Sequence, residues 1–276
     1  MKLTTAKKGA RHRRHRKAGA GWLGIDRVSI VAIVVFLLFL AAWEWVFIPL
    51  TGISPTLLPR PSQIGPALWQ GFASGYLLPN VLITLEEVLV GFLVGASLGF
   101  LLAIPVAEWP AVERILSPYV VALQAVPKVA VAPLFVIWFG YGLTSKVVIV
   151  ALITFFPVFV NSVVGLRAMP PEQDELFRIY RASRWQRFIY AKVPNSADYV
   201  FAGLNVGVTL SVIGAIVAEF VGAQEGLGSV ILRAGFQLDS AGLFAAVGVL
   251  TLIAAVLSFL VQAIGRRVVF WTNTNT

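Results

Sequence analysis

The chain has 276 residues, of which 58% are hydrophobic, with a net charge of +9 and a mean hydropathy of +0.84. Soluble domains contain about 45–50% apolar residues, so this composition indicates a membrane protein. Its apolar runs are continuous and long, which favours helices over the short alternating strands of a barrel. The absence of cysteine excludes disulfides, thiolate metal sites and a cysteine nucleophile.

Residues 1–27 form a strongly basic segment with nine of the twenty-two Lys and Arg residues. Such a segment has too few apolar residues to bury a core, so we expect a disordered tail. Its two histidines, His12 and His15, are expected to be solvated rather than bound to a metal. The apolar run from Val28 to Leu50 follows. It is too long for the core of a cleaved signal peptide and predicts a first membrane span.

Five further apolar runs predict five more spans, so residues 28–265 form one all-α, polytopic membrane domain of about six transmembrane helices. Between the first and second runs, the segment 62–72 is expected to form a short amphipathic helix on the membrane surface. The five runs are Val81 to Ala107, Ile115 to Phe139, Val147 to Leu166, Tyr199 to Gly222, and Ala241 to Gly265.

Small residues and prolines distinguish two of these spans. In the second span, Gly91, Gly95 and Gly99 recur every four residues, a row that allows another helix to approach closely. A polar break at 108–114 precedes the third span. Prolines interrupt that third span, so it cannot be one straight helix, and such broken helices occur where they are buried in protein or line a cavity. These prolines are Pro118, Pro127 and Pro133.

Lys and Arg are distributed unevenly between the two sides of the predicted bundle. With the N-terminus inside, eighteen of the twenty-two lie in inner segments, and the outer loops hold only Arg60, Lys146 and Arg233. The positive-inside rule therefore predicts that both termini are cytoplasmic, with 266–276 as a second tail. This distribution explains the net charge without a nucleic-acid partner, and the basic tail is expected to contact anionic lipid headgroups.

The longest cytoplasmic loop, residues 167–198, predicts two helices separated by a turn. Pro171 and the acidic residues after it are typical of a helix start. Ser183 and Gln186 fit a capping box at the start of a second helix, which Pro194 is expected to end or kink.

Aromatic side chains interleaved with arginines give this loop the composition of an interface. A loop that only joined two spans would need four or five residues. The residues alone leave two interpretations open: a docking surface for another protein, or an amphipathic hairpin against the inner leaflet. The aromatic residues are Phe177, Tyr180, Trp185, Phe188 and Tyr190.

Ionisable residues inside a span are candidate functional groups. Lys128 lies within the third span, and Gln124 precedes it by one helical turn. Lys128 is a candidate pathway cation with Gln124 as companion, the alternatives being a buried ion pair or a side chain that reaches water. Glu86, Glu87 and Glu219 lie near the outer ends of spans, and each favours a packing or interfacial role over contact with a solute.

No motif for catalysis occurs in the sequence. It lacks a G-x-x-x-x-G-K-[ST] phosphate loop, H-E-x-x-H and G-x-S-x-G. We therefore expect no catalytic residue, no metal site and no cofactor bound by this chain.

From about Leu57 to the sixth span, the chain resembles the permease subunits of binding-protein-dependent ABC importers. The branch it resembles most handles nitrate, sulfonates, taurine and pyrimidine- or riboflavin-type vitamin precursors. The matching stretches are Leu58 to Ser62, Pro133 to Phe135, Trp138 to Gly140, Phe155 to Val158, Gly165 to Arg167, Ala182 to Gln186, Val193-Pro194, Ala202 to Leu204, Ala218 to Phe220 and Gly226 to Gly228.

The resemblance identifies the two-helix loop as the element that couples to an ATPase. The family signature is Glu-Ala-Ala, three residues, Gly, and later Leu-Pro. Here Glu175-Leu176-Phe177 occupies the first position, Arg181 the Gly position, and Val193-Pro194 the Leu-Pro position. A left-handed backbone at Arg181 would cost about 1–2 kcal/mol. The residues implied in coupling are Glu175, Leu176, Phe177, Arg181, Ala182, Ser183, Arg184 and Pro194.

The resemblance also implies the assembly. A second permease copy, two ATPase subunits carrying ATP-Mg, and an external solute-binding protein would complete an importer in the bacterial inner membrane. The alternatives are an ion-coupled secondary transporter, which would need an inverted repeat that the sequence does not display, and a membrane-embedded enzyme, which the missing motifs disfavour. The stretches Val126 to Ala130 and Glu219 to Ala223 resemble vitamin-precursor permeases more than sulfonate permeases. The resemblance also places Glu219 in a recurring Ala-Glu pair, which makes it the best pathway candidate of the three glutamates.

Overall fold

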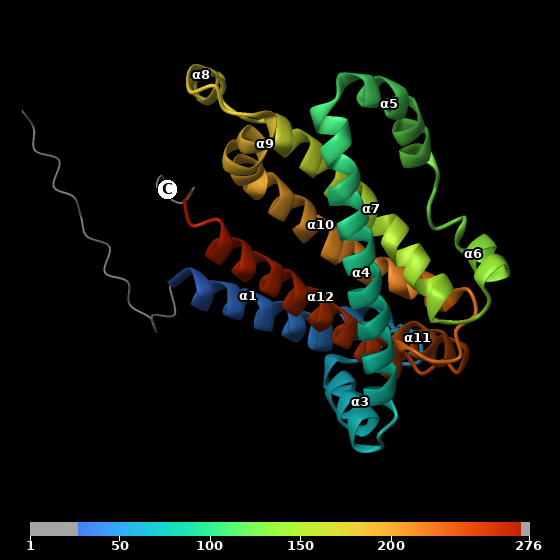
Figure 1. The fold of residues 1–276 in the computed structure, drawn as a ribbon. Coiled ribbons are helices and arrows are strands. Elements are labelled where there is room, and N and C mark those ends of the chain that lie inside the picture. The colour runs from blue at the N-terminus through green and yellow to red at the C-terminus, as the bar shows by residue number, and fades with distance from the viewer. Residues whose placement is uncertain (1–26, 272–276) are drawn as a thin grey trace, which may run out of the picture.

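The computed structural model describes residues 27–271, and within that range all regular structure is helical (Figure 1). The elements in chain order are α1 (Arg27–Ala42), the π-helical turn η1 (Trp43–Phe47), α2 (Ile48–Thr51), α3 (Pro61–Ala73), α4 (Leu77–Glu108), α5 (Pro110–Ala125), α6 (Ala132–Phe139), α7 (Leu143–Arg167), α8 (Pro171–Ile179), α9 (Arg184–Arg187), the π-helical turn η2 (Phe188–Lys192), α10 (Val193–Phe220), α11 (Leu227–Phe236) and α12 (Ser240–Val268). The disorder expected for the N-terminal tail concerns residues outside the described range, apart from Arg27.

Five of the six predicted spans are confirmed as long apolar helices. In the described part of the chain, five helical segments are long and apolar enough to cross a membrane: Ile30–Thr51, Leu77–Glu108, Leu143–Arg167, Arg184–Phe220 and Ser240–Val268. The helix predicted at 62–72 is present as α3, and its position on the membrane surface stays a prediction.

The third predicted span is divided into two helices. α5 and α6 are separated by the non-helical residues 126–131, so the chain is broken near Pro127. The other two prolines do not break a helix, since Pro118 lies inside α5 and Pro133 lies in the first turn of α6. The polar residues at 108–114 do not form a loop, because α5 already begins at Pro110 and only Trp109 separates it from α4. Proline suits the first turn of a helix, where its missing N–H is not needed.

The glycine row of α4 is a helix-packing surface, as predicted, and its partner is α7. A Cβ added at Gly95 would lie 2.9 Å from the Cα of Ala151, and one at Gly99 would lie 2.8 Å from the carbonyl oxygen of Phe155. Any side chain at these positions would push the two helices apart. Lipid tails are as apolar as leucine, so this close backbone packing, rather than withdrawal from water, stabilises the pair.

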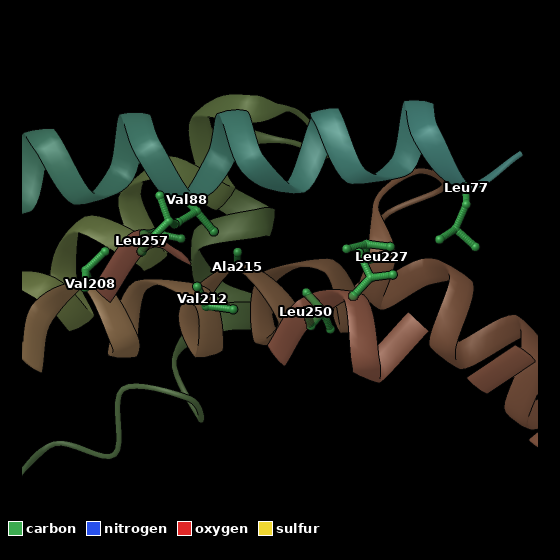
Figure 2. Packing of buried hydrophobic residues seen from close by; sticks show 10 residues of the cluster. Leu77, Val88, Val208, Val212, Ala215, Leu227, Leu250 and Leu257 are labelled. Atoms are coloured by element: carbon green, nitrogen blue, oxygen red, sulfur yellow. The ribbon is translucent and has the colours of Figure 1, made fainter. Parts of the chain in front are cut away.

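α7 also packs along α10, and α12 closes the other side of α10. A cluster of buried apolar residues joins these helices to α4 and α11. Figure 2 shows Val88 reaching from α4 toward Val212 of α10 and Leu257 of α12. The helices α4, α7 and α10 therefore form the centre of the bundle, and α1 and α5 lie outside it (Figure 1).

Short helices mark the two ends of the bundle. α8 and α9 lie at one end, near the junction of α4 and α5, while α3 and α11 lie at the opposite end (Figure 1). We call the first the basic end, because the arginines of the 167–198 loop are there. α11 was not predicted: its ten residues, with glycines at Gly228 and Gly235, are too few to stand out from a loop.

Candidate functional site

α8 is a nine-residue helix at the basic end with the start signals that the sequence predicted. Pro171 is in its first turn together with Glu172 and Asp174, and Arg178 is in its last turn. Acidic side chains near the N-terminus of a helix and basic side chains near its C-terminus interact favourably with the partial charges of the helix dipole. These local signals explain why so short and polar a segment becomes helical.

The turn after α8 is a Schellman motif with arginine at the position that usually holds glycine. The Ala182 amide donates to the Phe177 carbonyl at 2.9 Å, and the Arg181 amide donates to the Arg178 carbonyl at 3.0 Å. Arg181 has φ 49°, in the left-handed region. The left-handed backbone considered for this position is therefore present. Because arginine carries a Cβ, this conformation costs about 1–2 kcal/mol here.

The predicted capping box at Ser183 is confirmed. Ser183 Oγ accepts from the Gln186 amide at 3.2 Å, and the Ser183 amide donates to Gln186 Oε1 at 2.8 Å. Pro194 does not end the helix. The chain stays helical through η2 into α10, because the Val193 amide bonds back five residues to Phe188 and Pro194 enters in the first turn of α10.

Side-chain contacts hold α8 against the following helices and leave one side of it open. Asp174 forms an ion pair with Arg187 of α9, and Gln173 Oε1 accepts from Asn195 Nδ2 at 2.6 Å. Glu175 is exposed, and Leu176 is 51% exposed. A cavity of about 280 Å³ lies between this turn and η2, and its lining residues are Leu176, Phe177, Tyr180, Ala182, Gln186 and Tyr190.

Lys128 lies in the non-helical break between α5 and α6. Its Nζ donates to the backbone carbonyl of Gln124 at 3.2 Å and stands 4.5 Å from the ring centroid of Phe156 in α7. The helical spacing assumed for Gln124 and Lys128 does not apply, because the helix ends at Ala125. Among the residues that the structure describes, Lys128 contacts a carbonyl and an aromatic ring and no carboxylate, in contrast to the buried ion pair that one alternative expected.

Glu219 organises the turn that precedes α11. The side chain is fully buried, its Oε1 accepts from the Thr84 hydroxyl at 2.6 Å, and the Gly228 amide donates to its Oε2. The Thr84 hydroxyl in turn accepts from the Leu227 amide at 2.8 Å. Both carboxylate oxygens are engaged inside the bundle, which favours the packing alternative for Glu219 over direct contact with a solute.

A second buried carboxylate, that of Glu87, forms an ion pair. The sequence predicts only that Glu87 lies near the end of a span. Glu87 of α4 accepts from Lys146 Nζ of α7 at 2.5 Å, with side-chain exposures of 1% and 12%. The sequence predicts a packing role for Glu87 and an outer-loop position for Lys146, and no spacing in the sequence links the two residues. Glu86, its neighbour, is exposed.

Ion pairs also tie the helices together at the basic end, but they are more exposed. Arg167 pairs with Glu113 at 2.5 Å and lowers the pKa of the Glu113 carboxyl through this hydrogen bond. Lys192 pairs with Glu108 at 2.5 Å. These contacts join the ends of α4, α5, α7 and η2.

A family model described as the inner membrane component of binding-protein-dependent transport systems matches residues 95–270. The chain belongs to this family. The match includes the 167–198 loop, the broken third span and α10 to α12, so the resemblance inferred from the sequence is confirmed.

Curated relatives of this permease come from several transport systems. The riboflavin transport system permease protein RibX of Chloroflexus aurantiacus is 38% identical over 86% of this chain and 88% of its own length. The formylaminopyrimidine transport permease protein ThiX of Halalkalibacterium halodurans is 37% identical over 79% of this chain and 86% of its own length. The taurine permease TauC of Escherichia coli is 28% identical over 90% of this chain and 91% of its own length.

Solved structures share the fold at lower sequence identity. An amino acid ABC transporter chain superposes with a TM-score of 0.58 and 17% identity, covering 72% of this chain and 97% of its own. A chain of the MetNI methionine ABC transporter in an inward-facing conformation superposes with a TM-score of 0.51 and 20% identity, covering 77% of this chain and 97% of its own. These likenesses support the helical permease fold.

Proposed function

We propose that this permease is the non-catalytic membrane subunit of an ATP-driven importer, and that α8 is its docking element for an ATPase. The observation that carries the proposal is the open side of α8. Glu175 and Leu176 are exposed there beside a Schellman turn and a capped second helix, which together present them in one fixed geometry. Family membership makes an ATPase the natural occupant of this side.

In the proposed assembly, two permease copies form the pathway, and each docks one ATPase subunit that binds ATP-Mg. A solute-binding protein delivers the solute at the opposite end, near α3 and α11. Both termini face the ATPases. ATP binding closes the ATPase pair, and α8 passes this movement through Asp174 and Arg187 to α9 and α10. The residues proposed to act in this coupling are Glu175, Leu176, Phe177, Arg181, Ala182, Ser183, Arg184 and Pro194.

We further propose a vitamin-precursor heterocycle as the solute, in preference to a sulfonate or nitrate. Support comes from the higher identity to the riboflavin and formylaminopyrimidine permeases, 38% and 37%, than to the taurine permease, 28%. Lys128 beside the Phe156 ring offers a cation and an aromatic face to an electron-rich ring, and the backbone carbonyl of Gln124 accepts from its Nζ at 3.2 Å.

The docking proposal is tested by co-purification of the ATPase with the full-length permease. Glu175→Arg should lower the amount of ATPase that co-purifies at least tenfold, and abolish ATP-dependent uptake, because the charge of an exposed docking residue is reversed. Arg114→Glu is the matched control, since Arg114 is also exposed at the basic end but lies on α5. Uptake by this chain alone, driven by an ion gradient and indifferent to ATP, would refute the proposal.

The solute proposal is tested separately in proteoliposomes that contain the complete transporter. Riboflavin or formylaminopyrimidine should be taken up in preference to taurine and nitrate. Lys128→Met should reduce uptake at least fivefold while the ATPase still co-purifies. Preferred uptake of taurine or nitrate would refute the solute class but leave the docking proposal standing.

A further inference from the structure

The turn between α11 and α12 has the same construction as the turn after α8, at the opposite end of the bundle. The Asp239 amide donates to the Ala234 carbonyl at 2.9 Å. The Leu238 amide donates to the Gly235 carbonyl at 3.2 Å, which completes a Schellman motif. Leu238 has φ 56°, and in the described part of the chain Arg181 is the one other non-glycine residue with a left-handed backbone. Asp239 then caps α12 through its side chain.

Side chains of the bundle fix the start of α11. The three successive backbone amides at 226–228 donate to Asn80 Oδ1, the Thr84 hydroxyl and Glu219 Oε2, the first two at 2.8 Å. The first amides of a helix have no acceptor within that helix, so these bonds supply what α11 itself lacks. The helix and the turn at its end are therefore held in one orientation on α4 and α10.

Leu238 is unfavourable at this turn in two ways. Its left-handed backbone is strained, because the Cβ of an L-residue then approaches the following carbonyl oxygen. Its side chain is also 61% exposed, so the chain gains little from its apolar surface. Glycine or asparagine would form the same turn with less strain and without an exposed apolar group. Burial of the Leu238 side chain by a partner would offset both disadvantages.

A groove of about 1060 Å³ lies beside this turn, between α3, α11 and the starts of α4 and α12, and Leu238 is part of its wall. Arg233 also lines the groove, with its guanidinium carbon 5.5 Å from the Tyr76 ring centroid, and it contacts no carboxylate among the described residues. The side-chain amides of Gln70 and Gln237 line it too, and neither has a hydrogen-bond partner in the described part of the chain. An apolar group, a cation and free amides together are typical of a protein interface.

We propose that this groove docks the external solute-binding protein, which places an apolar pocket over Leu238 and a carboxylate beside Arg233. The inference rests on the proposed importer, in which that protein delivers the solute at this end. A lipid fits less well, because acyl chains would leave the amides of Gln70 and Gln237 without partners. A symmetric contact with a second permease copy would bring two Arg233 cations into one interface, which is unfavourable.

The test uses the complete permease–ATPase complex in nanodiscs and titrates it with the purified solute-binding protein of the same transport system. Leu238→Asn should raise the dissociation constant at least tenfold, because asparagine tolerates the left-handed backbone but removes the apolar contact. Thermal stability in detergent should be unchanged or higher, since the strain is reduced. Leu238→Met is the matched control: it keeps both the apolar side chain and the strain, and the dissociation constant should stay within threefold of wild type.

A second pair of variants tests the charge. Arg233→Gln should weaken binding at least fivefold, whereas Arg60→Gln should leave it within twofold, because Arg60 is exposed at the start of α3 but does not line the groove. Wild-type affinity of both Leu238→Asn and Arg233→Gln would overturn the docking surface. So would a Leu238→Asn variant that lowers the dimer fraction of the permease, or its thermal stability, and not the affinity for the binding protein. In these cases ATP-driven uptake by the wild-type complex would leave the importer proposal standing, and the absence of such uptake would refute the importer itself.

Discussion

The two ends of this bundle are held together by different kinds of polar contact. At the end near α11, Glu219 is fully buried and Glu87 is 1% exposed, and both are bonded to neighbouring helices. At the basic end, the Arg187–Asp174 pair has side-chain exposures of 27% and 32%, and the Arg167–Glu113 pair 37% and 38%.

This difference predicts which end is fixed and which can move. A buried charge that loses its partner cannot be rescued by water, so such a contact is expensive to break. A half-exposed ion pair is replaced by hydration at little cost and contributes about 0–1 kcal/mol. The contacts at the end near α11 therefore lock α4, α7 and α10 together, whereas those at the basic end allow α8 and α9 to shift.

The largest effect is expected for Glu219→Ala. The change leaves the Thr84 hydroxyl and the Gly228 amide without their acceptor inside the bundle. We expect a loss of about 4 kcal/mol in the free energy of unfolding, measured as reduced thermal stability in detergent. Glu86→Ala removes an exposed carboxylate from α4 and should change stability by less than about 0.5 kcal/mol. Equal effects of the two variants would contradict the assignment of a locked end.

Lys146→Met should cost slightly less, about 3 kcal/mol, because Glu87 then keeps a buried charge without its partner. Adding Glu87→Gln removes that charge, so the double variant should regain at least half of the lost stability. The measurement is a double-mutant cycle in thermal unfolding. Additive losses would show that Lys146 and Glu87 do not interact as the structure describes.

Local signals made most of the architecture predictable from sequence. The spans follow from the length of apolar runs, and the Ser183 cap follows from residues three positions apart. The glycine row of α4 indicated close packing, and its partner became known only from the structure. The length of a span, the Ser183 cap and the glycine row are each determined by residues within one helix or one turn.

The polar cluster near α11 could not be predicted, because its partners are far apart in sequence. Thr84 and Glu219 are joined only once α4 and α10 pack together, and neither residue type at either position signals the other. The location of Lys128 outside a helix could not be predicted from the sequence for a related reason. A proline shows that a helix breaks, but it does not show how many residues stay unwound, and here the break includes Lys128 itself.

A smaller effect, of opposite sign, is expected for Arg181→Gly. Glycine adopts the left-handed backbone at this position without strain, so the turn should become more stable by about 1 kcal/mol. Arg178→Gly is the matched control, because the same change inside α8 should destabilise it by about 1 kcal/mol. The rate of limited proteolysis within 167–198 measures both. A faster cleavage of the Arg181→Gly variant would contradict the strain at this turn.

Asp174→Asn should have the smallest effect on stability, at most about 0.5 kcal/mol, because the Arg187–Asp174 pair is partly exposed. This variant should nevertheless have a measurable effect on the coupling between the permease and the ATPase. If α8 moves as a docking element linked to α9 by this pair, the ATPase should still co-purify while ATP hydrolysis becomes less dependent on solute delivery. Glu113→Gln breaks another exposed pair at the same end, away from α8, and should leave that dependence unchanged. A loss above about 2 kcal/mol for Asp174→Asn would mean that the basic end is locked as firmly as the end near α11.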